Sequence, residues 1–101
     1  MTERSPFKPH YGTNQVVTPG AASANIPIAA GDKTVRVVNT GANVAYFRIS
    51  TATAAQAATT ADCPVASGSF VMVEKEQDWT NFAHISPVGS TLQVMTGEGG
   101  Y

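Results

Sequence analysis

Short runs of β-branched and aromatic residues recur about every ten residues along the chain, and Gly, Pro, Asn or Asp interrupts each run. Runs with this composition and these boundaries are typical of β-strands. Their repetition at this spacing is typical of two stacked sheets. We therefore expect strands over residues 14–18, 23–28, 34–38, 44–49, 69–73, 79–85 and 91–96.

The predicted fold class is all-β, an antiparallel, jelly-roll-like β-sandwich of about seven to eight short strands. The chain of 101 residues accommodates one such domain, which we place at residues 13–97, followed by a flexible C-terminal tail at 98–101. Residues 51–68 show no apolar stripe at helical spacing, so we expect a long loop with one short strand, or a single helical turn near 54–58. Pro27 cannot donate a backbone hydrogen bond, which predicts that its strand lies at a sheet edge or carries a bulge.

Residues 1–12 are expected to form an extended N-terminal arm. Pro6 and Pro9 disfavour a helix there and pre-set extended backbone. Phe7 and Tyr11 give the arm two apolar anchors, which favour docking on a neighbouring subunit. The alternative is an ordinary frayed terminus.

Alternation along each strand separates inward from outward side chains. The expected inward set is small and largely β-branched: Val35, Val37, Ala45, Phe47, Ile49, Val71, Val73, Ala83, Ile85, Leu92 and Val94. The expected outward set includes several apolar residues: Tyr46, Phe70, Met72, Phe82 and Met95. If these side chains are contiguous they form an interaction surface, and the alternative is that both faces of a sheet are covered within the fold.

The composition favours a chain that works inside an assembly. Charged residues make up 13% of the chain, about half the usual share, which suits a surface covered by neighbours. The alternative is an ordinary Ala- and Thr-rich monomer. The net charge of −1 and the scattered lysines and arginines disfavour nucleic acid and an anionic membrane as partners. No run has transmembrane length and no signal peptide is visible, so we expect synthesis in the cytoplasm without export.

Acid–base and nucleophilic groups are few. His10 sits in the proline-rich arm, where we expect nothing to hold it in a defined geometry. His84 is expected to be a partly buried strand histidine with one hydrogen bond. Cys63, the single cysteine, is expected to be a small buried hydrophobe, since the charge of Asp62 raises the pKa of the neighbouring thiol.

The acidic residues near residue 76 are weak candidates for a functional site. Glu74, Glu76 and Asp78 alternate around Lys75, and a solvated turn explains them better than a cation site or an acid–base pair. The sequence has neither zinc-ligand spacing nor a glycine-rich phosphate loop followed by a helix. We therefore expect no enzymatic activity, no cofactor, no metal and no small-molecule substrate.

Three segments carry a resemblance to a known class of proteins. They are Ala24-Asn-Ile-Pro-Ile, the succession Val35-Arg-Val-Val-Asn-Thr-Gly with Ala45-Tyr-Phe-Arg-Ile, and the closing Leu92-Gln-Val-Met-Thr-Gly-Glu-Gly. Together they resemble small β-sandwich virion proteins of tailed bacteriophages, over roughly residues 22–50 and 90–99. The arm has no counterpart in that resemblance.

The resemblance implies a capsid decoration or cement protein, located in the virion and assembled in the host cytoplasm. Its expected partners are the major capsid protein or other virion proteins and further copies of itself, through sheet-face contacts and arm exchange. The alternatives are a tail-fibre, head–tail or carbohydrate-binding module, in which Trp79 and Tyr46 would stack on sugar rings. The predicted partner-binding residues are Phe7, Tyr11, Tyr46, Phe70 and Phe82.

Overall fold

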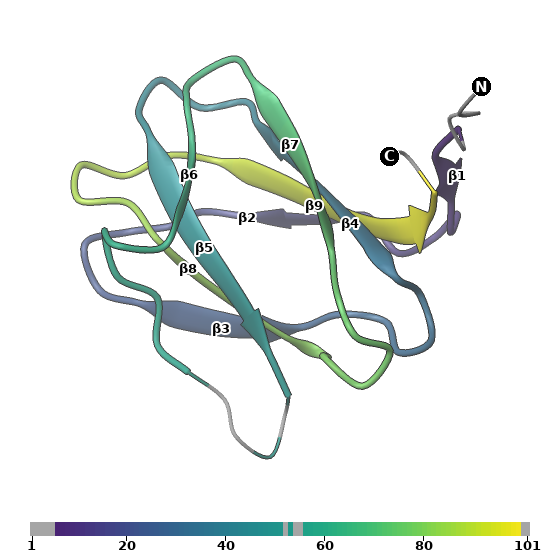
Figure 1. Ribbon diagram of the computed structural model, residues 1–101. Coiled ribbons are helices and arrows are strands. Elements are labelled where there is room, and N and C mark those ends of the chain that lie inside the picture. The colour runs from purple at the N-terminus through teal and green to yellow at the C-terminus, as the bar shows by residue number, and fades with distance from the viewer. Residues whose placement is uncertain (1–5, 52, 54–55, 100–101) are drawn as a thin grey trace.

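The computed structural model describes residues 6–51, 53 and 56–99, and over these residues it consists of β-strands and their connections (Figure 1). The predicted all-β sandwich is confirmed. Each of the seven expected strands is present, to within three residues at its ends, together with two further short strands, one in the N-terminal segment and one in the 51–68 segment, where a short strand was expected. The strands are β1 (Lys8–Pro9), β2 (Gln15–Val17), β3 (Ala24–Pro27), β4 (Thr34–Asn39), β5 (Ala45–Ser50), β6 (Cys63–Val65), β7 (Phe70–Glu74), β8 (Asn81–Ile85) and β9 (Leu92–Glu98).

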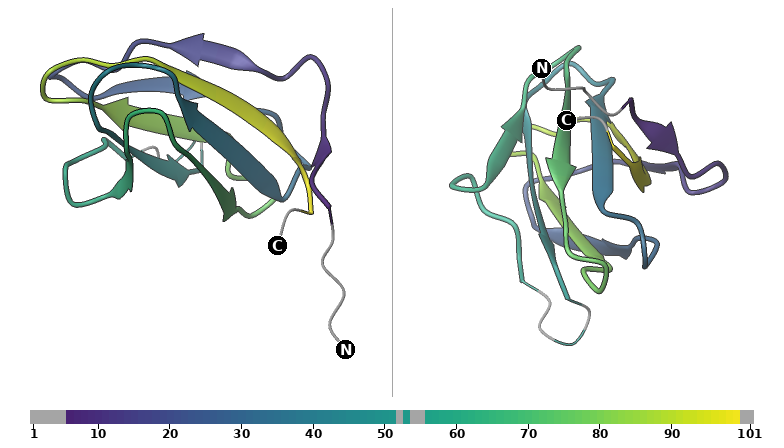
Figure 2. Two further views of the ribbon diagram at one scale, coloured as in Figure 1. Left: turned by 90° about the horizontal axis from the view of Figure 1, so that it is seen from above. Right: turned by 45° about the vertical axis from the view of Figure 1, so that its right-hand side comes forward.

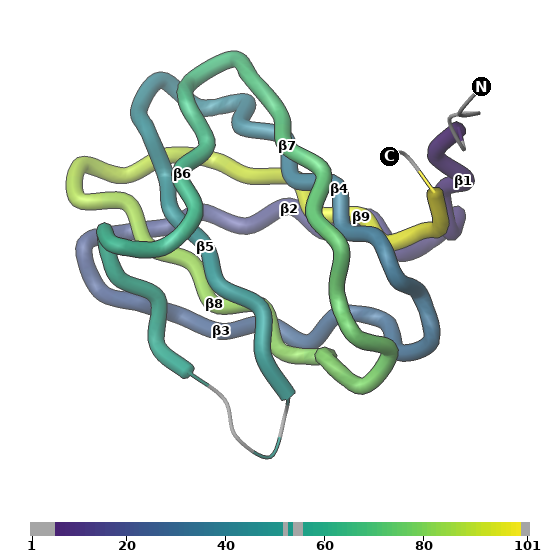
Figure 3. The backbone as a smooth tube through the Cα atoms, in the orientation of Figure 1, coloured from purple at the N-terminus to yellow at the C-terminus, as the bar shows by residue number. Residues whose placement is uncertain are grey.

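All strand pairs are antiparallel, and they are nested along the chain. β2 pairs with β9, β3 with β8, β4 with β7 and β5 with β6. The first sheet has five strands, in the order β1-β9-β4-β7 with β2 also on β9, and the second has the order β3-β8-β5-β6. Successive strands from β2 to β5 therefore alternate between the sheets, as the tube in Figure 3 traces, and this is the strand order of a jelly roll.

Strands 34–38 and 44–49 have the spacing of a hairpin, but they do not form one. β4 lies in the first sheet and β5 in the second, so the residues between them cross the sandwich. The buried Asn39 side chain holds this crossing in place. Its Nδ2 donates to the carbonyls of Asn43 and Val65, both at 2.8 Å, and its Oδ1 accepts from the Gly41 amide and the Ser90 hydroxyl, both at 2.9 Å. These bonds satisfy polar groups at a place where water is largely excluded.

The core fills the space between the sheets. The Phe47 and Phe82 rings stack at its centre, with centroids 5.2 Å apart. The predicted inward positions on β4, β5, β7 and β9 are confirmed, because their side chains are buried or pack against the buried cluster. The buried cluster consists of Val17, Ile28, Val35, Val37, Ala45, Phe47, Val65, Phe82, Leu92 and Val94.

The predicted orientation of β8 is wrong. Phe82 pairs with Ile49 and is fully buried, so it faces the core rather than the outside. Ala83 pairs with Arg48 and Ile85 with Tyr46, on the outer face. Each set of alternating side chains on β8 contains an apolar residue and a polar one, so alternation alone does not choose between them. The larger ring takes the interior because it removes more apolar surface from water.

Two smaller expectations about strands are confirmed. The 51–68 segment contains one short strand, β6, at the edge of the second sheet. β3, which ends at Pro27, is the opposite edge strand of the same sheet. Of the helical turn considered at 54–58, residues 54 and 55 lie outside the described residues.

The described part of the N-terminal segment lies on the same chain's first sheet. β1 pairs with the end of β9, Lys8 opposite Glu98 and Pro9 opposite Gly97, at one end of the sandwich (Figure 2). The Phe7 ring lies so close to Gly97 that a side chain at Gly97 would overlap it. β9 ends at Glu98, one residue beyond the expected domain boundary. Residues 1–5 and 100–101, which belong to the expected arm and tail, lie outside the described residues.

Candidate functional site

The five predicted contact residues do not form one surface. Phe70 is 54% exposed on the outer face of the first sheet, whereas Tyr46 is half-buried on the outer face of the second. Tyr11 is 83% exposed in the turn after β1, and Phe7 is half-buried against the end of β9. Phe82 has no exposed surface, so its assignment as a contact residue is wrong. Of the five, Phe70 is the one whose sheet face carries a second exposed large apolar side chain, Val16.

The outer face of the first sheet combines side chains from four strands. In one row across the sheet, Val16, Gln93, Val38 and Phe70 are register partners, and in the next row Met95, Arg36 and Met72 are partners. Val16 is 63% exposed, and the others except Phe70 are half-buried. We call these seven side chains the outer face.

Arg36 is the charged residue in the middle of the outer face. Its guanidinium lies over the Phe70 ring, 5.3 Å from the centroid, in cation–π contact. Its Nε is buried and has no hydrogen-bond partner among the described residues. Beside it a hollow of about 460 Å³ is lined by Asn14, Arg36, Val38, Thr40, Gln93 and Met95.

The outer side of the second sheet differs, because its arginine is already paired. Arg48 contacts the Asp62 carboxylate through Nη2 at 2.8 Å and through Nε at 3.0 Å. Asp62 in turn accepts a hydrogen bond from the Thr59 amide at 2.8 Å. Among the described residues, Arg36 of the outer face therefore has no ion pair, whereas Arg48 on the second sheet is paired with a carboxylate.

Sequence reasoning placed Met72 and Met95 on outward positions but did not select them as contacts, and Arg36 and Val38, which alternate with the inward Val35 and Val37, were not selected either. The alternation in strands 34–38 and 91–96 was the available signal. Alternation within a strand does not predict which strands lie next to one another in the sheet. Only the pairing of β4 with both β7 and β9 shows that these side chains are neighbours.

His10 is held in a defined geometry, contrary to expectation. Its Nδ1 lies 2.6 Å from Asp32 Oδ2, and the Thr96 hydroxyl donates to the same carboxylate oxygen at 2.7 Å. The His10 amide donates to the Thr96 carbonyl at 2.9 Å, and the Thr13 hydroxyl donates to the His10 carbonyl at 2.6 Å. This cluster fastens the chain after β1 to β9 and to the turn before β4.

The pKa of the Asp32 carboxyl lies below its ordinary value. Burial alone would raise it, but the hydrogen bonds from Thr96 and His10 and the charges of His10 and Lys75 outweigh burial. The folded protein thus holds this proton more weakly than the unfolded chain does. Lowering the pH therefore favours unfolding.

We expect the stabilisation from Asp32 to be complete above pH of about 3.9, the unfolded value, and to disappear as pH falls through the lower folded value. Urea unfolding of the wild type and of Asp32→Asn, measured from neutral pH down to pH of about 2, isolates this contribution from other acidic groups. The difference in free energy of unfolding between the wild type and Asp32→Asn should shrink as the pH falls towards about 2. Parallel curves over the whole range would contradict the role assigned to Asp32.

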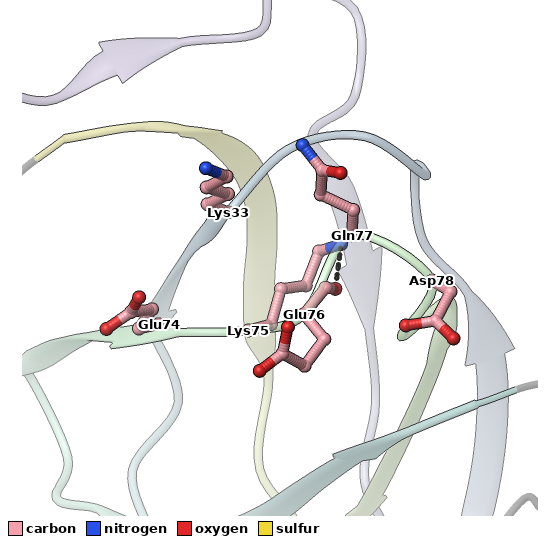
Figure 4. A pocket seen from close by; sticks show the side chains of 6 residues that line it. All are labelled: Lys33, Glu74, Lys75, Glu76, Gln77 and Asp78. Atoms are coloured by element: carbon pink, nitrogen blue, oxygen red, sulfur yellow. Dashed lines mark hydrogen bonds between the residues drawn. The ribbon is translucent and has the colours of Figure 1, made fainter.

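A polar hollow of about 440 Å³ lies at the connection between β7 and β8 (Figure 4). Glu74, Glu76 and Asp78 are exposed, as expected for a solvated turn, and Figure 4 shows their carboxyl groups spread along it. Lys75 is unexpectedly buried, 3% exposed, with Nζ donating to the Glu76 carbonyl at 3.2 Å. Burial lowers the pKa of Lys75, against the charges of Asp32, Asp78 and Glu98, which raise it. Lys75 is therefore packed within the turn rather than solvated at its surface.

The remaining reactive side chains do not come together. His84 is 4% exposed, more buried than expected; its Nδ1 has no hydrogen-bond partner among the described residues, and burial lowers its pKa. Burial and the Asp62 charge raise the pKa of the half-buried Cys63 thiol. Within the described ranges no three His, Cys, Asp or Glu side chains are grouped as metal ligands.

Trp79, considered with Tyr46 as a stacking residue for sugar rings, lies in a different setting from Tyr46. It is half-buried and shares a shallow hollow of about 200 Å³ with residues that include Ile49, Cys63 and Val73, but not Tyr46. This setting agrees with a tryptophan that plugs the side of the sandwich.

In the part of the chain that the structure describes, no helix is long and apolar enough to cross a membrane.

No family model, no curated protein and no solved structure matches this chain.

Proposed function

We propose that this protein is a virion structural protein of the capsid decoration or cement type, which docks through its outer face on other virion proteins. The observation that carries the proposal is the outer face itself. Exposed Val16 and Phe70 lie at the two ends of a row that also contains half-buried Gln93 and Val38, and Met72 and Met95 lie on either side of Arg36 in the next row. A sheet face of this kind, apolar except for Gln93 and Arg36, is suited to association with another protein.

The fold and composition support the same proposal by analogy. Jelly rolls are a recurrent architecture of viral capsid proteins, and also of lectins and cupins, so the topology alone does not select a function. A 13% share of charged residues suits a chain whose surface is largely covered. Among these uses, the resemblance of the sequence to phage virion proteins favours the capsid.

The test is binding of the purified chain to capsids of the phage whose genome encodes it, stripped of this protein. Val16→Ser/Phe70→Ser should weaken binding by at least about tenfold, because it removes the two most exposed apolar anchors of the outer face. Val88→Ser is the matched control, since Val88 is 72% exposed in the β8–β9 turn and not on the sheet.

The control variant should bind like the wild type. Absence of the protein from purified virions, or wild-type binding that the double variant retains in full, would overturn the proposal. Circular dichroism of each variant checks that the sheet structure is intact before binding is compared.

A further inference from the structure

The outer face presents a cation without an anion. The two ion pairs of the described residues join His10 to Asp32 and Arg48 to Asp62, and neither involves Arg36. Arg36 is surrounded instead by its register partners Met72 and Met95. A guanidinium set among apolar side chains is partly desolvated, and its buried Nε has no acceptor among the described residues.

The stacking on Phe70 fixes how this group is presented. The ring holds the guanidinium carbon 5.3 Å from its centroid, which limits the rotamers that Arg36 can adopt. A guanidinium held in this way is pre-organised for a planar carboxylate, which it binds with two parallel hydrogen bonds. The adjoining hollow of about 460 Å³ has room for such a side chain and combines the apolar Val38 and Met95 with the polar Asn14 and Gln93.

A second copy of the chain fits this face poorly. If two outer faces met about a twofold axis, the same central patch would oppose itself and bring two Arg36 side chains together. Like charges at the centre of an apolar contact oppose association. A partner of opposite charge has no such penalty.

We infer that the outer face binds a different protein whose contact surface carries an Asp or Glu carboxylate among apolar side chains, with that carboxylate on Arg36. This inference rests on the proposed function and specifies the chemistry of the partner. The apolar side chains supply contact area, and the charge pair fixes the register of docking.

The first experiment uses stripped capsids and the full chain. Arg36→Met keeps the apolar stem but removes the charge, and should weaken binding by at least about tenfold. Lys33→Met is the matched control, because Lys33 is exposed at the polar hollow away from this face, and it should bind like the wild type. Wild-type binding that Arg36→Met retains would overturn the inference while leaving the proposed function standing.

The second experiment needs no capsid. N-acetylglutamate N-methylamide and its glutamine counterpart are titrated into the chain while the Arg36 Nε–H and Met95 methyl signals are followed by NMR. The glutamate probe should shift both signals saturably, and the glutamine probe or the Arg36→Met protein should not. Equal shifts with both probes overturn the inference. Shifts specific to glutamate without capsid binding overturn the proposed function but support the carboxylate site.

Sedimentation of the chain alone tests whether a second copy of the chain occupies the outer face. If the wild type self-associates at all, Arg36→Met should leave that self-association unchanged. Self-association that depends on Arg36 would assign the face to a second copy and overturn the inference of a foreign partner.

Discussion

Replacing Asn39 with alanine is expected to lower the free energy of unfolding by about 2 to 4 kcal/mol. The substitution removes the donor to the Val65 carbonyl, which is buried, and leaves that acceptor without a partner. It also releases the Gly41 amide and the Ser90 hydroxyl from Oδ1. A buried polar group that loses its partner costs about 1 to 3 kcal/mol. A domain of this size has a total stability of about 5 to 15 kcal/mol, so the loss is severe.

Urea unfolding followed by the fluorescence of Trp79 measures this loss. Asn43→Ala is the matched control. Within the described residues the Asn43 side chain makes one hydrogen bond, from Nδ2 to the Gly89 carbonyl at 2.9 Å, and the Asn43 backbone carbonyl still accepts from Asn39 in the variant. We expect the control to lose about 1 kcal/mol. If both variants lost the same free energy, Asn39 would not be the residue that ties the β4–β5 crossing to β6.

The same residue shows where sequence reasoning stops. The strands were predictable because each is a compact run of β-branched or aromatic residues between turn-forming residues. Runs of this kind favour a β-strand over other secondary structure. Asn39-Thr-Gly41 was equally recognisable as a turn signal. That this turn crosses between sheets depends on bonds to Val65 and Ser90, which are distant in sequence, and no local pattern contains them.

The candidate site was predictable in part for a related reason. Period-two alternation places Arg36 opposite Val35 and Val37 without any knowledge of the fold. The neighbours of Arg36 come from strand pairing, so the contact with Phe70 and the joining of Met72 to Met95 across β4 needed the structure. His10 was misjudged in the same way, because Asp32 and Thr96 reach it only through the pairing of β1 with β9.

Phe82 and Phe70 give the second large prediction, since they are the same residue type in opposite settings. Phe82→Ala should lower the free energy of unfolding by about 3 to 5 kcal/mol, because it leaves a cavity against the stacked Phe47 ring. Phe70→Ala should cost less than about 1 kcal/mol, since more than half of its surface is exposed and it loses mainly the contact with Arg36.

Binding should follow the opposite order. Phe70→Ala removes an exposed anchor and the support of Arg36, so its affinity for stripped capsids should fall by about tenfold or more while its urea midpoint stays close to that of the wild type. Phe82→Ala, studied at a temperature where it is still folded, should bind with nearly wild-type affinity, because the outer face belongs to the other sheet. If Phe82→Ala lost binding while folded and Phe70→Ala did not, the contact surface would lie on the second sheet. The outer face would then be an ordinary exposed side of the sandwich.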